Sequence, residues 1–423
     1  MRFRRCGAAG AGLILVGALL AAPQQKQQTP FVSFVFRNWA AWDRDHNDVL
    51  SPEEIDAAVL DPSITGDDAA AAGTLKLMVR HKEMKDVALT KDYFQKYGRQ
   101  RLAKGALAAD EAAEMQTVDY QNQEKPAGKP APGSPPDWDL FFSAGRHRIS
   151  KAAGGWTGRF NLDNMRQGPL GDCFFVSSLG SLLLSRPAQL KSLLKPLPDG
   201  SFDAIFPGQA AFAVRRPTDA ELSISSVSAG DGYWLAVMEQ AFGEFRARKQ
   251  GLEDDEEATD SISHGGRTGP TIDALTGNSH KSIAAGPSVE RRKADAAKVL
   301  PQLRTEMLAA LRDHRVMTVS VMSYTVDAAG KITDGKDHGT GPHIPPGITS
   351  HHAYAIISYD KASDAIGLWN PHGQTYAPKG QAGLEFGYPT EHGRFTLPLT
   401  EAYSFCANFT FEIPKPPKTK QKR

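Results

Sequence analysis

The chain has 423 residues, of which 40% are hydrophobic and 23% charged, and its formal net charge is +1. This length accommodates two or three domains with cores of their own, and the composition excludes a disordered chain and a bundle of membrane helices. Because 49 basic side chains balance 48 acidic ones, no overall field attracts nucleic acid or anionic lipid, and we expect no nucleic-acid partner.

The N-terminus has the pattern of a secretory signal peptide. Three arginines in "MRFRR" precede an apolar stretch from Ala8 to Ala22, and the polar run "PQQKQQ" follows. An uncleaved anchor is the alternative, but about 15 apolar residues fall short of the roughly 20 that a membrane-spanning helix needs. The sequence therefore predicts a signal peptide at residues 1–22, an exported protein (secreted, periplasmic or at the cell surface) and no stable membrane span.

Composition divides the rest of the chain into parts. Residues 31–121 are rich in Ala, Asp, Glu and Lys, a composition that predicts a small all-α domain. A linker is predicted at residues 122–137, because five prolines fall within "EKPAGKPAPGSPPD". Over residues 138–417, helical patterns mix with short β-like runs and Gly-rich turns, which is typical of an α+β domain. Residues 418–423 form a basic tail.

The stretch "DRDHNDVLSPEE", residues 43–54, has oxygen-bearing side chains at the first, third, fifth, ninth and twelfth positions. A calcium loop requires this spacing, with a backbone carbonyl at the seventh position. The predicted Ca²⁺ ligands are Asp43, Asp45, Asn47, Val49 through its carbonyl, Ser51 through a water molecule, and Glu54. An acidic, solvated loop without metal is the alternative interpretation.

The flanks of this loop favour a helix–loop–helix calcium unit. An apolar helix is predicted before it, and Ser51 with Glu54 forms a capping box that opens the next helix. Asp48 departs from the pattern, because the sixth position normally holds Gly in a left-handed turn. The region resembles an EF-hand. Its expected partner hand has Lys82 and Met84 where ligands should be, so we predict that the second hand binds no metal.

Cys173 lies in "RQGPLGDCFF", directly before the apolar run "FFVSSLGSLLLS". This run predicts a largely buried helix that starts near the cysteine. A thiol at a helix N-terminus is favoured as the reactive thiolate, although a small core cysteine is the simpler interpretation of this motif alone. Cys406 lies in an alternating, strand-like run; it could pair with Cys173 in an oxidising compartment, but a free buried thiol is the preferred interpretation.

A thiol nucleophile needs an imidazole and a group that orients the ring. "SHHAYAIISYD" places His351 and His352 at the head of a β-like run, and "AIGLWNPHG" ends a second run with Asn370. Two adjacent strands that carry these residues would bring a histidine and an asparagine together. Taken singly, a histidine or an asparagine in such a position is also typical of an ordinary surface histidine or turn asparagine.

Five blocks of the chain, in order, resemble the calpain-like cysteine proteases, which have a papain-like fold. "QGPLGDCFF" is similar to the family's Q-G-x-L-G-D-C-W block, "HAYAI" to its G-H-A-Y block and "WNPHG" to its R-N-P-W-G block. Between them, "YWLAVMEQAFGEF" resembles the W-x-x-L-x-E-K-A-Y helix and "HGGRTGPTIDALTG" the G-G-x-x-x-E-A-L-x-x-L-T-G segment. The resemblance covers roughly residues 137–414.

The resemblance implies a two-subdomain protease core, at about residues 138–278 and 279–417, with the active site between the halves. It implies a calpain-type cysteine endopeptidase that acts on protein or peptide substrates. Cys173 would be the nucleophile, His352 the general acid and base, and Asn370 the group that orients the imidazole. Gln167 would donate its side-chain amide to the oxyanion, together with the Cys173 backbone N–H.

Three positions depart from the family pattern. Phe174 replaces a Trp and keeps an aromatic ring. His372 replaces the Trp that shields the His–Asn contact in the family, which predicts either lower activity or a wetter site. His351 replaces the Gly before the active histidine; His352 is chosen because its spacing to "AY" matches the family block.

Other functions stay open at this point. One is a calcium-binding scaffold whose protease fold is weakly active or inactive, and another is acyl transfer by the same thioester chemistry. A metal site at His338, His343, His351 and His352 lacks regular ligand spacing, so structural or exposed roles are favoured for His338 and His343. The sequence predicts neither the natural substrate nor the oligomeric state.

Overall fold

The computed structural model describes residues 28–103, 136–250, 259–263, 265–286, 288–321, 325–326, 332–333 and 344–416. The predicted signal peptide, residues 122–135 of the predicted linker, His338, His343 and the basic tail lie outside these ranges. Within them, no helix is long and apolar enough to cross a membrane.

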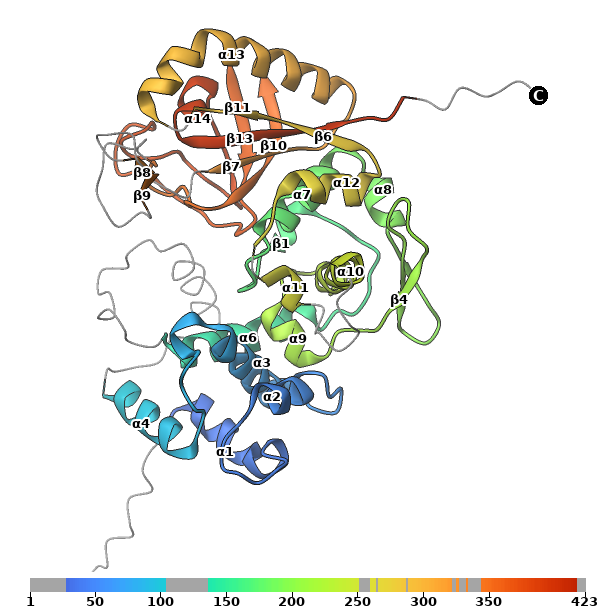
Figure 1. The fold of residues 1–423 in the computed structure, drawn as a ribbon, viewed down its shortest axis with the longest axis vertical. Helices are drawn as coiled ribbons and strands as arrows, with labels where there is room; N and C mark the ends of the chain where they lie inside the picture. The colour runs from blue at the N-terminus through green and yellow to red at the C-terminus, as the bar shows by residue number, and fades with distance from the viewer. Residues whose placement is uncertain are drawn as a thin grey trace, which may run out of the picture.

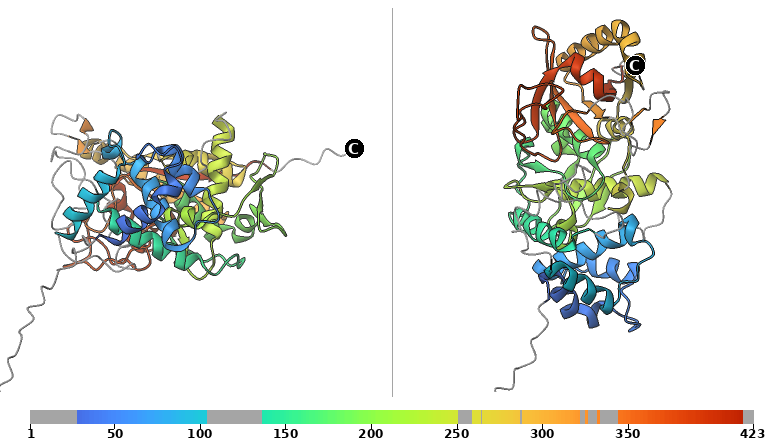
Figure 2. Two further views of the ribbon diagram at one scale, coloured as in Figure 1. Left: turned by 90° about the horizontal axis from the view of Figure 1, so that it is seen from below. Right: turned by 90° about the vertical axis from the view of Figure 1, so that its left-hand side faces the viewer.

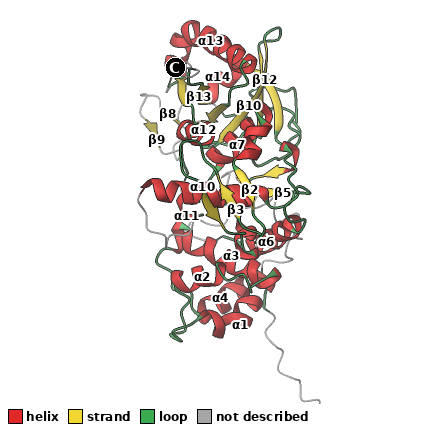
Figure 3. Ribbon diagram, turned by 90° about the vertical axis from the view of Figure 1, so that its right-hand side faces the viewer, coloured by secondary structure: helices red, strands yellow, loops and turns green. Residues whose placement is uncertain are grey.

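The molecule has three tiers along its long axis (Figures 1 and 2). The N-terminal tier is helical in its described part, the middle tier is mostly helical, and the third tier holds the main sheet (Figure 3). This mixture of helix and sheet confirms the predicted α+β class.

In the residues that the structure describes, the N-terminal tier consists of two helix–loop–helix pairs. Its elements are α1 (Pro30–Trp42), α2 (Pro52–Val59), α3 (Gly66–Arg80), η1 (Lys82–Met84) and α4 (Lys91–Leu102). The two loops touch through a bridge between Val49 and Thr90, and the Leu50 N–H donates to the Leu89 carbonyl at 3.1 Å. The predicted capping box of Ser51 and Glu54 is present at the start of α2.

The helix α6 (Trp138–Ala152) joins this tier to the next. Its Trp138, Phe141 and Phe142 are buried in the same apolar cluster as Phe31 of α1, and α3 packs against both α6 and α9 (Asp219–Ile224). A Cβ atom at Gly73 would lie 2.0 Å from Ser223 Oγ and 2.8 Å from the Ala220 carbonyl oxygen. Only glycine therefore permits this close approach of α3 to α9.

Charged groups reinforce the contact between the first two tiers. Lys76 of α3, whose side chain is buried, bonds Asp56 of the same tier and Asp260 of the middle tier. Arg80 also pairs with Asp260. Because a buried ammonium needs paired acceptors, this cluster ties α2 and α3 to the middle tier.

The middle tier surrounds one apolar core built on α7 and α10. Its helices are α7 (Cys173–Ser185), α8 (Pro187–Ser192), α9, α10 (Trp234–Gln250), α11 (Asp260–Ser263), α12 (Thr268–Thr276) and η2 (Leu162–Asn164). Its strands are β1 (Met165–Arg166), β2 (Leu194–Pro196), β3 (Phe202–Ala204), β4 (Phe212–Val214) and β5 (Val227–Ser228). β1 pairs with β5, which holds the chain just before the cysteine block.

The third tier is an antiparallel sheet of order β12-β11-β10-β7-β13-β6. Its strands are β6 (Ser279–Ala284), β7 (Met317–Val321), β10 (Ala353–Asp360), β11 (Ala365–Trp369), β12 (Arg394–Pro398) and β13 (Cys406–Ile413). The helices α13 (Val289–Arg312) and α14 (Leu399–Phe405) and the short pair β8 (Thr325–Val326) and β9 (Ile332–Thr333) complete it. A second apolar core lies within this tier.

The helix α7 connects the middle and third tiers. It packs on β10 and β7, and a Cβ atom at Gly180 would lie 2.6 Å from the ring of Trp369. Ser181 Oγ accepts the Met317 N–H at 2.8 Å, and Arg186 bonds the buried Glu412 carboxylate of β13 at 2.7 Å. The helix that begins with Cys173 is therefore clamped against the sheet along its length.

Candidate active site

Cys173 is the first residue of α7, so the predicted helix start is confirmed. The thiol is partly buried and lies against the backbone N–H of Ala353, the residue after His352. Burial raises the pKa of Cys173 to about 11, although the Ala353 N–H and the N–H groups at the helix start oppose the shift. The helix N-terminus therefore does not produce a thiolate by itself, because desolvation outweighs it.

Cys406 is the other cysteine in the described residues. It is a free thiol, fully buried at the start of β13. The preferred interpretation of a free buried thiol is confirmed. Burial raises its pKa to about 12, so it is inert as a nucleophile.

His352 and Asn370 lie side by side because β10 and β11 are antiparallel neighbours. His352 immediately precedes β10, and Asn370 immediately follows β11. The Nε2 atom of His352 lies 2.9 Å from Oδ1 of Asn370, and both residues are buried. His351 is exposed and has a positive φ of 54°. The structure thus brings His352, rather than His351, to the asparagine.

The surroundings of Asn370 determine which nitrogen of His352 carries the proton. Asn370 Oδ1 also accepts the backbone N–H of His372 at 3.0 Å, which fixes this atom as the oxygen of the amide. The Nε2 atom of His352 must then be the donor, and its Nδ1 atom is left as the base. Burial lowers the pKa of His352 to about 4, and the bond to Asn370 only partly offsets this.

His372 covers the imidazole of His352. Its ring stacks on that of His352 with centroids 4.3 Å apart and planes 20° apart, and only 4% of His372 is exposed. The expectation of a wetter site is therefore wrong, because an imidazole occupies the shielding position itself. Burial lowers the pKa of His372 well below its usual range, and the neighbouring His352 adds to this.

Gln167 lies at the other side of the site, after β1. Its backbone N–H donates to the Pro371 carbonyl at 2.9 Å, which links the cysteine block to the asparagine block. Its side-chain Nε2 donates to the Leu170 carbonyl at 2.9 Å, so one N–H of the amide is used within the loop. Gln167 Oε1 has no hydrogen-bond partner among the described residues.

The four residues predicted from the sequence thus come together from three segments of the chain: residues 167–173, the start of β10 and the end of β11. A family model described as calpain family cysteine protease matches residues 154–381. This chain belongs to the calpain family of cysteine proteases. A comparison with curated proteins found no match.

The calpain-family match contains the whole cysteine, histidine and asparagine arrangement. It begins after α6, so the helix that docks the N-terminal tier lies outside it, as does the predicted calcium loop. The structure shows two contacts that the sequence analysis missed: the Ala353 N–H at the thiol and the stacking of His372 on His352. Both depend on how the strands meet, and no local sequence pattern reports that.

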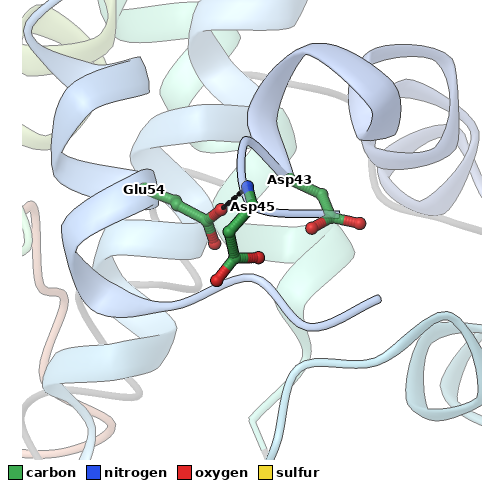
Figure 4. A group of neighbouring side chains, drawn as sticks. All are labelled: Asp43, Asp45 and Glu54. Carbon is green, nitrogen blue, oxygen red and sulfur yellow. Dashed lines mark hydrogen bonds between the residues drawn. The ribbon is translucent and has the colours of Figure 1, made fainter. Parts of the chain in front are cut away.

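The predicted calcium loop has a compact acidic centre. Asp43, Asp45 and Glu54 each offer an oxygen, and these oxygens lie within 4.8 Å of one another; Figure 4 shows the three carboxylates on one side of the loop. Asp48 has a φ of 61°, which is the left-handed conformation that the sixth loop position requires. A donor set made of oxygen atoms suits a hard cation such as Ca²⁺.

The remaining predicted ligands make hydrogen bonds within the loop. Asn47 Oδ1 accepts the Val49 N–H at 2.8 Å, and Ser51 Oγ lies 3.0 Å from Glu54 Oε2. In the second loop, Met84 is buried and its sulfur accepts the Tyr93 hydroxyl at 3.6 Å. A thioether is not a calcium ligand; the metal-free second hand stays a prediction.

We predict that His372→Phe makes the protein less sensitive to acid. The native state keeps His372 neutral, whereas the unfolded chain binds a proton as the pH falls below about 6.5, so acid favours unfolding. Between pH 7 and pH 5 the variant should lose about 2 kcal/mol less of its free energy of unfolding than the wild type does. Urea unfolding at both pH values measures this.

The matched control is His314→Asn, because His314 is exposed and its positive φ of 50° suits asparagine. This variant should keep the wild-type acid sensitivity. Equal losses of unfolding free energy between pH 7 and pH 5 in the wild type and in His372→Phe would show that the stacked imidazole is not held neutral.

Proposed function

We propose that this calpain-family protein is an exported endopeptidase that hydrolyses peptide bonds through Cys173, His352 and Asn370, and that its N-terminal tier binds Ca²⁺. The observation that carries the catalytic part is the 2.9 Å contact of His352 with Asn370, buried beside the thiol at the start of α7. The proposal of export rests on the N-terminal sequence alone.

The geometry supports thiol catalysis of the following kind. His352 Nδ1 takes the thiol proton, and the sulfur of Cys173 attacks the substrate carbonyl carbon. The backbone N–H of Cys173 and the free N–H of the Gln167 amide stabilise the negative oxygen. His352 then gives the proton to the leaving amine, and a water molecule activated by the same ring hydrolyses the thioester.

Both partners are neutral at rest. The pKa of the thiol is raised to about 11 and that of the imidazole is lowered to about 4, each mainly by burial. Proton transfer from sulfur to nitrogen therefore depends on substrate binding or on a closer approach of the middle and third tiers. Asn370 favours this transfer, because its Oδ1 atom stabilises the imidazolium that forms.

Cleavage of a disordered protein such as casein, by residues 24–423 under reducing conditions, tests the activity. Cys173→Ala should abolish cleavage, and His352→Ala should lower kcat on the order of 10² or more. His351→Asn is the matched control: it changes the exposed neighbouring histidine and should cleave like the wild type. Adding an amine acceptor distinguishes hydrolysis from acyl transfer.

If the wild type and Cys173→Ala are equally inactive with both calcium and thiol present, the calcium-binding scaffold is the better proposal. If His351→Asn loses activity and His352→Ala does not, the assignment of the base is wrong.

The proposed calcium site rests on the converging carboxylates of Asp43, Asp45 and Glu54. Glu54 is central, because its Oε1 accepts the backbone N–H groups of Arg44 and Asp45 at 2.7 and 3.3 Å, and its Oε2 accepts that of Ser51 at 3.0 Å. It therefore spans both ends of the loop. When bound, the cation would neutralise these clustered negative charges and fix the loop between α1 and α2.

We predict that Glu54→Gln weakens calcium binding on the order of tenfold or more, since the site loses a charged and potentially bidentate ligand. Calorimetric titration of the reduced protein measures the affinity. Glu53→Gln is the matched control, because Glu53 is adjacent, exposed and outside the cluster. Equal affinities for the two variants would contradict the assignment of Glu54.

A further inference from the structure

Two buried carboxyl groups lie next to each other at the segment that carries the nucleophile. This segment, residues 167–173, is called the nucleophile loop below. Asp172 is its last residue before the cysteine, and Glu239 is on α10; both are 0% exposed. A charged residue inside the apolar helical run "WLAVMEQAF" was the available sequence signal for Glu239.

Asp172 occupies the N-cap position of α7, but its side chain does not cap the helix. Its backbone carbonyl accepts the Phe175 N–H at 2.7 Å, while neither carboxyl oxygen receives a hydrogen bond from the described residues. An N-cap aspartate normally accepts from the first turn. The carboxyl of Asp172 instead faces Glu239.

Glu239 holds the other end of the nucleophile loop through one serine. Its two oxygens accept the Ser226 N–H at 3.2 and 2.9 Å, and Ser226 Oγ accepts the Gly168 N–H at 3.0 Å. A Cβ atom at Gly168 would lie 2.4 Å from the Ser225 carbonyl oxygen. The nucleophile loop therefore packs directly against residues 225–226, and Glu239 holds these residues through the Ser226 N–H.

Two carboxyls in contact and out of water hold one proton between them rather than two charges. Burial and the charge of Glu239 raise the pKa of Asp172 well above its usual range. Burial also raises the pKa of Glu239, but hydrogen bonds from Asp172 and Ser226 oppose this. Glu239 accepts the Ser226 N–H, whereas Asp172 receives no hydrogen bond from the described residues, so the carboxylate charge is better placed on Glu239 and the proton on Asp172, which donates to Glu239.

We propose that Glu239 is a positioning residue for catalysis: through Ser226 and through the proton shared with Asp172, it fixes both ends of the nucleophile loop. The loop carries Gln167 and Cys173, so this arrangement fixes the oxyanion donor relative to the nucleophile. It also keeps the single negative charge on Glu239, away from the sulfur. This inference rests on the proposed thiol chemistry.

The location of the charge makes the proposal testable with two isosteric variants. In Asp172→Asn, the amide donates to Glu239 as the protonated carboxyl does, and the charge stays in place. In Glu239→Gln, the amide oxygen accepts the Ser226 N–H and the amide nitrogen donates to Asp172, which becomes the charged group. An ionised Asp172 raises the pKa of the Cys173 thiol.

The experiment measures the rate of Cys173 alkylation by iodoacetamide against pH, with mass spectrometry to separate Cys173 from Cys406. Glu239→Gln should move the midpoint of the profile upward by about one pH unit, and lower kcat on a peptide substrate on the order of tenfold, with KM within about threefold. Asp172→Asn should keep the alkylation midpoint near that of the wild type. Asp172→Ala should lower kcat, and Asp172→Asn should restore it.

Glu412→Gln is the matched control. Glu412 is also 0% exposed, and it bonds Arg186 beyond the opposite end of α7. Identical alkylation midpoints for Glu239→Gln, Asp172→Asn and Glu412→Gln would overturn the proposal and reduce the pair to a structural role. Alkylation needs no turnover, so the midpoints can be compared even if the protein cleaves no substrate. Absence of cleavage would overturn the proposed function but not this proposal.

Discussion

The antiparallel pairing of β10 with β11 is the constraint on which the site depends. These strands bring His352 and Asn370 together, although 17 residues separate them in the sequence. A second bond to Asn370, from the His372 N–H, fixes the amide and leaves His352 Nδ1 as the base. The sheet therefore supplies both the position of the imidazole and its protonation pattern, and α7, packed across β10, supplies the thiol.

Burial gives this site its chemical character. The thiol and the two stacked imidazoles are all held in their neutral forms, since desolvation dominates the pKa of each. Beneath them, Asp172 and Glu239 are buried as well. A resting site of neutral groups is chemically quiet, and the proposed catalysis would need a change in solvation or a closer approach of the middle and third tiers. The N-terminal tier, which shares a core with α6, is attached to one of these tiers.

Sequence reasoning predicted the local features and missed those that depend on tertiary packing. The start of α7 at Cys173, the capping box at Ser51 and the α+β class follow from patterns within a few residues. The family blocks also indicated His352 over His351. The stacking of His372, the docking of α3 at Gly73 and the pairing of Asp172 with Glu239 each join segments distant in sequence. Local periodicity carries no information about such contacts. The domain boundaries, export and calcium binding stay predictions.

The most direct test of the central claim is covalent trapping by a peptidyl chloromethyl ketone, followed by mass spectrometry of the labelled peptides. The account predicts one label per chain, on Cys173 and not on Cys406, and a labelling rate that falls sharply in His352→Ala. Labelling of Cys173 at the same rate in His352→Ala, or labelling of Cys406 in its place, would contradict a catalytic thiol–imidazole site.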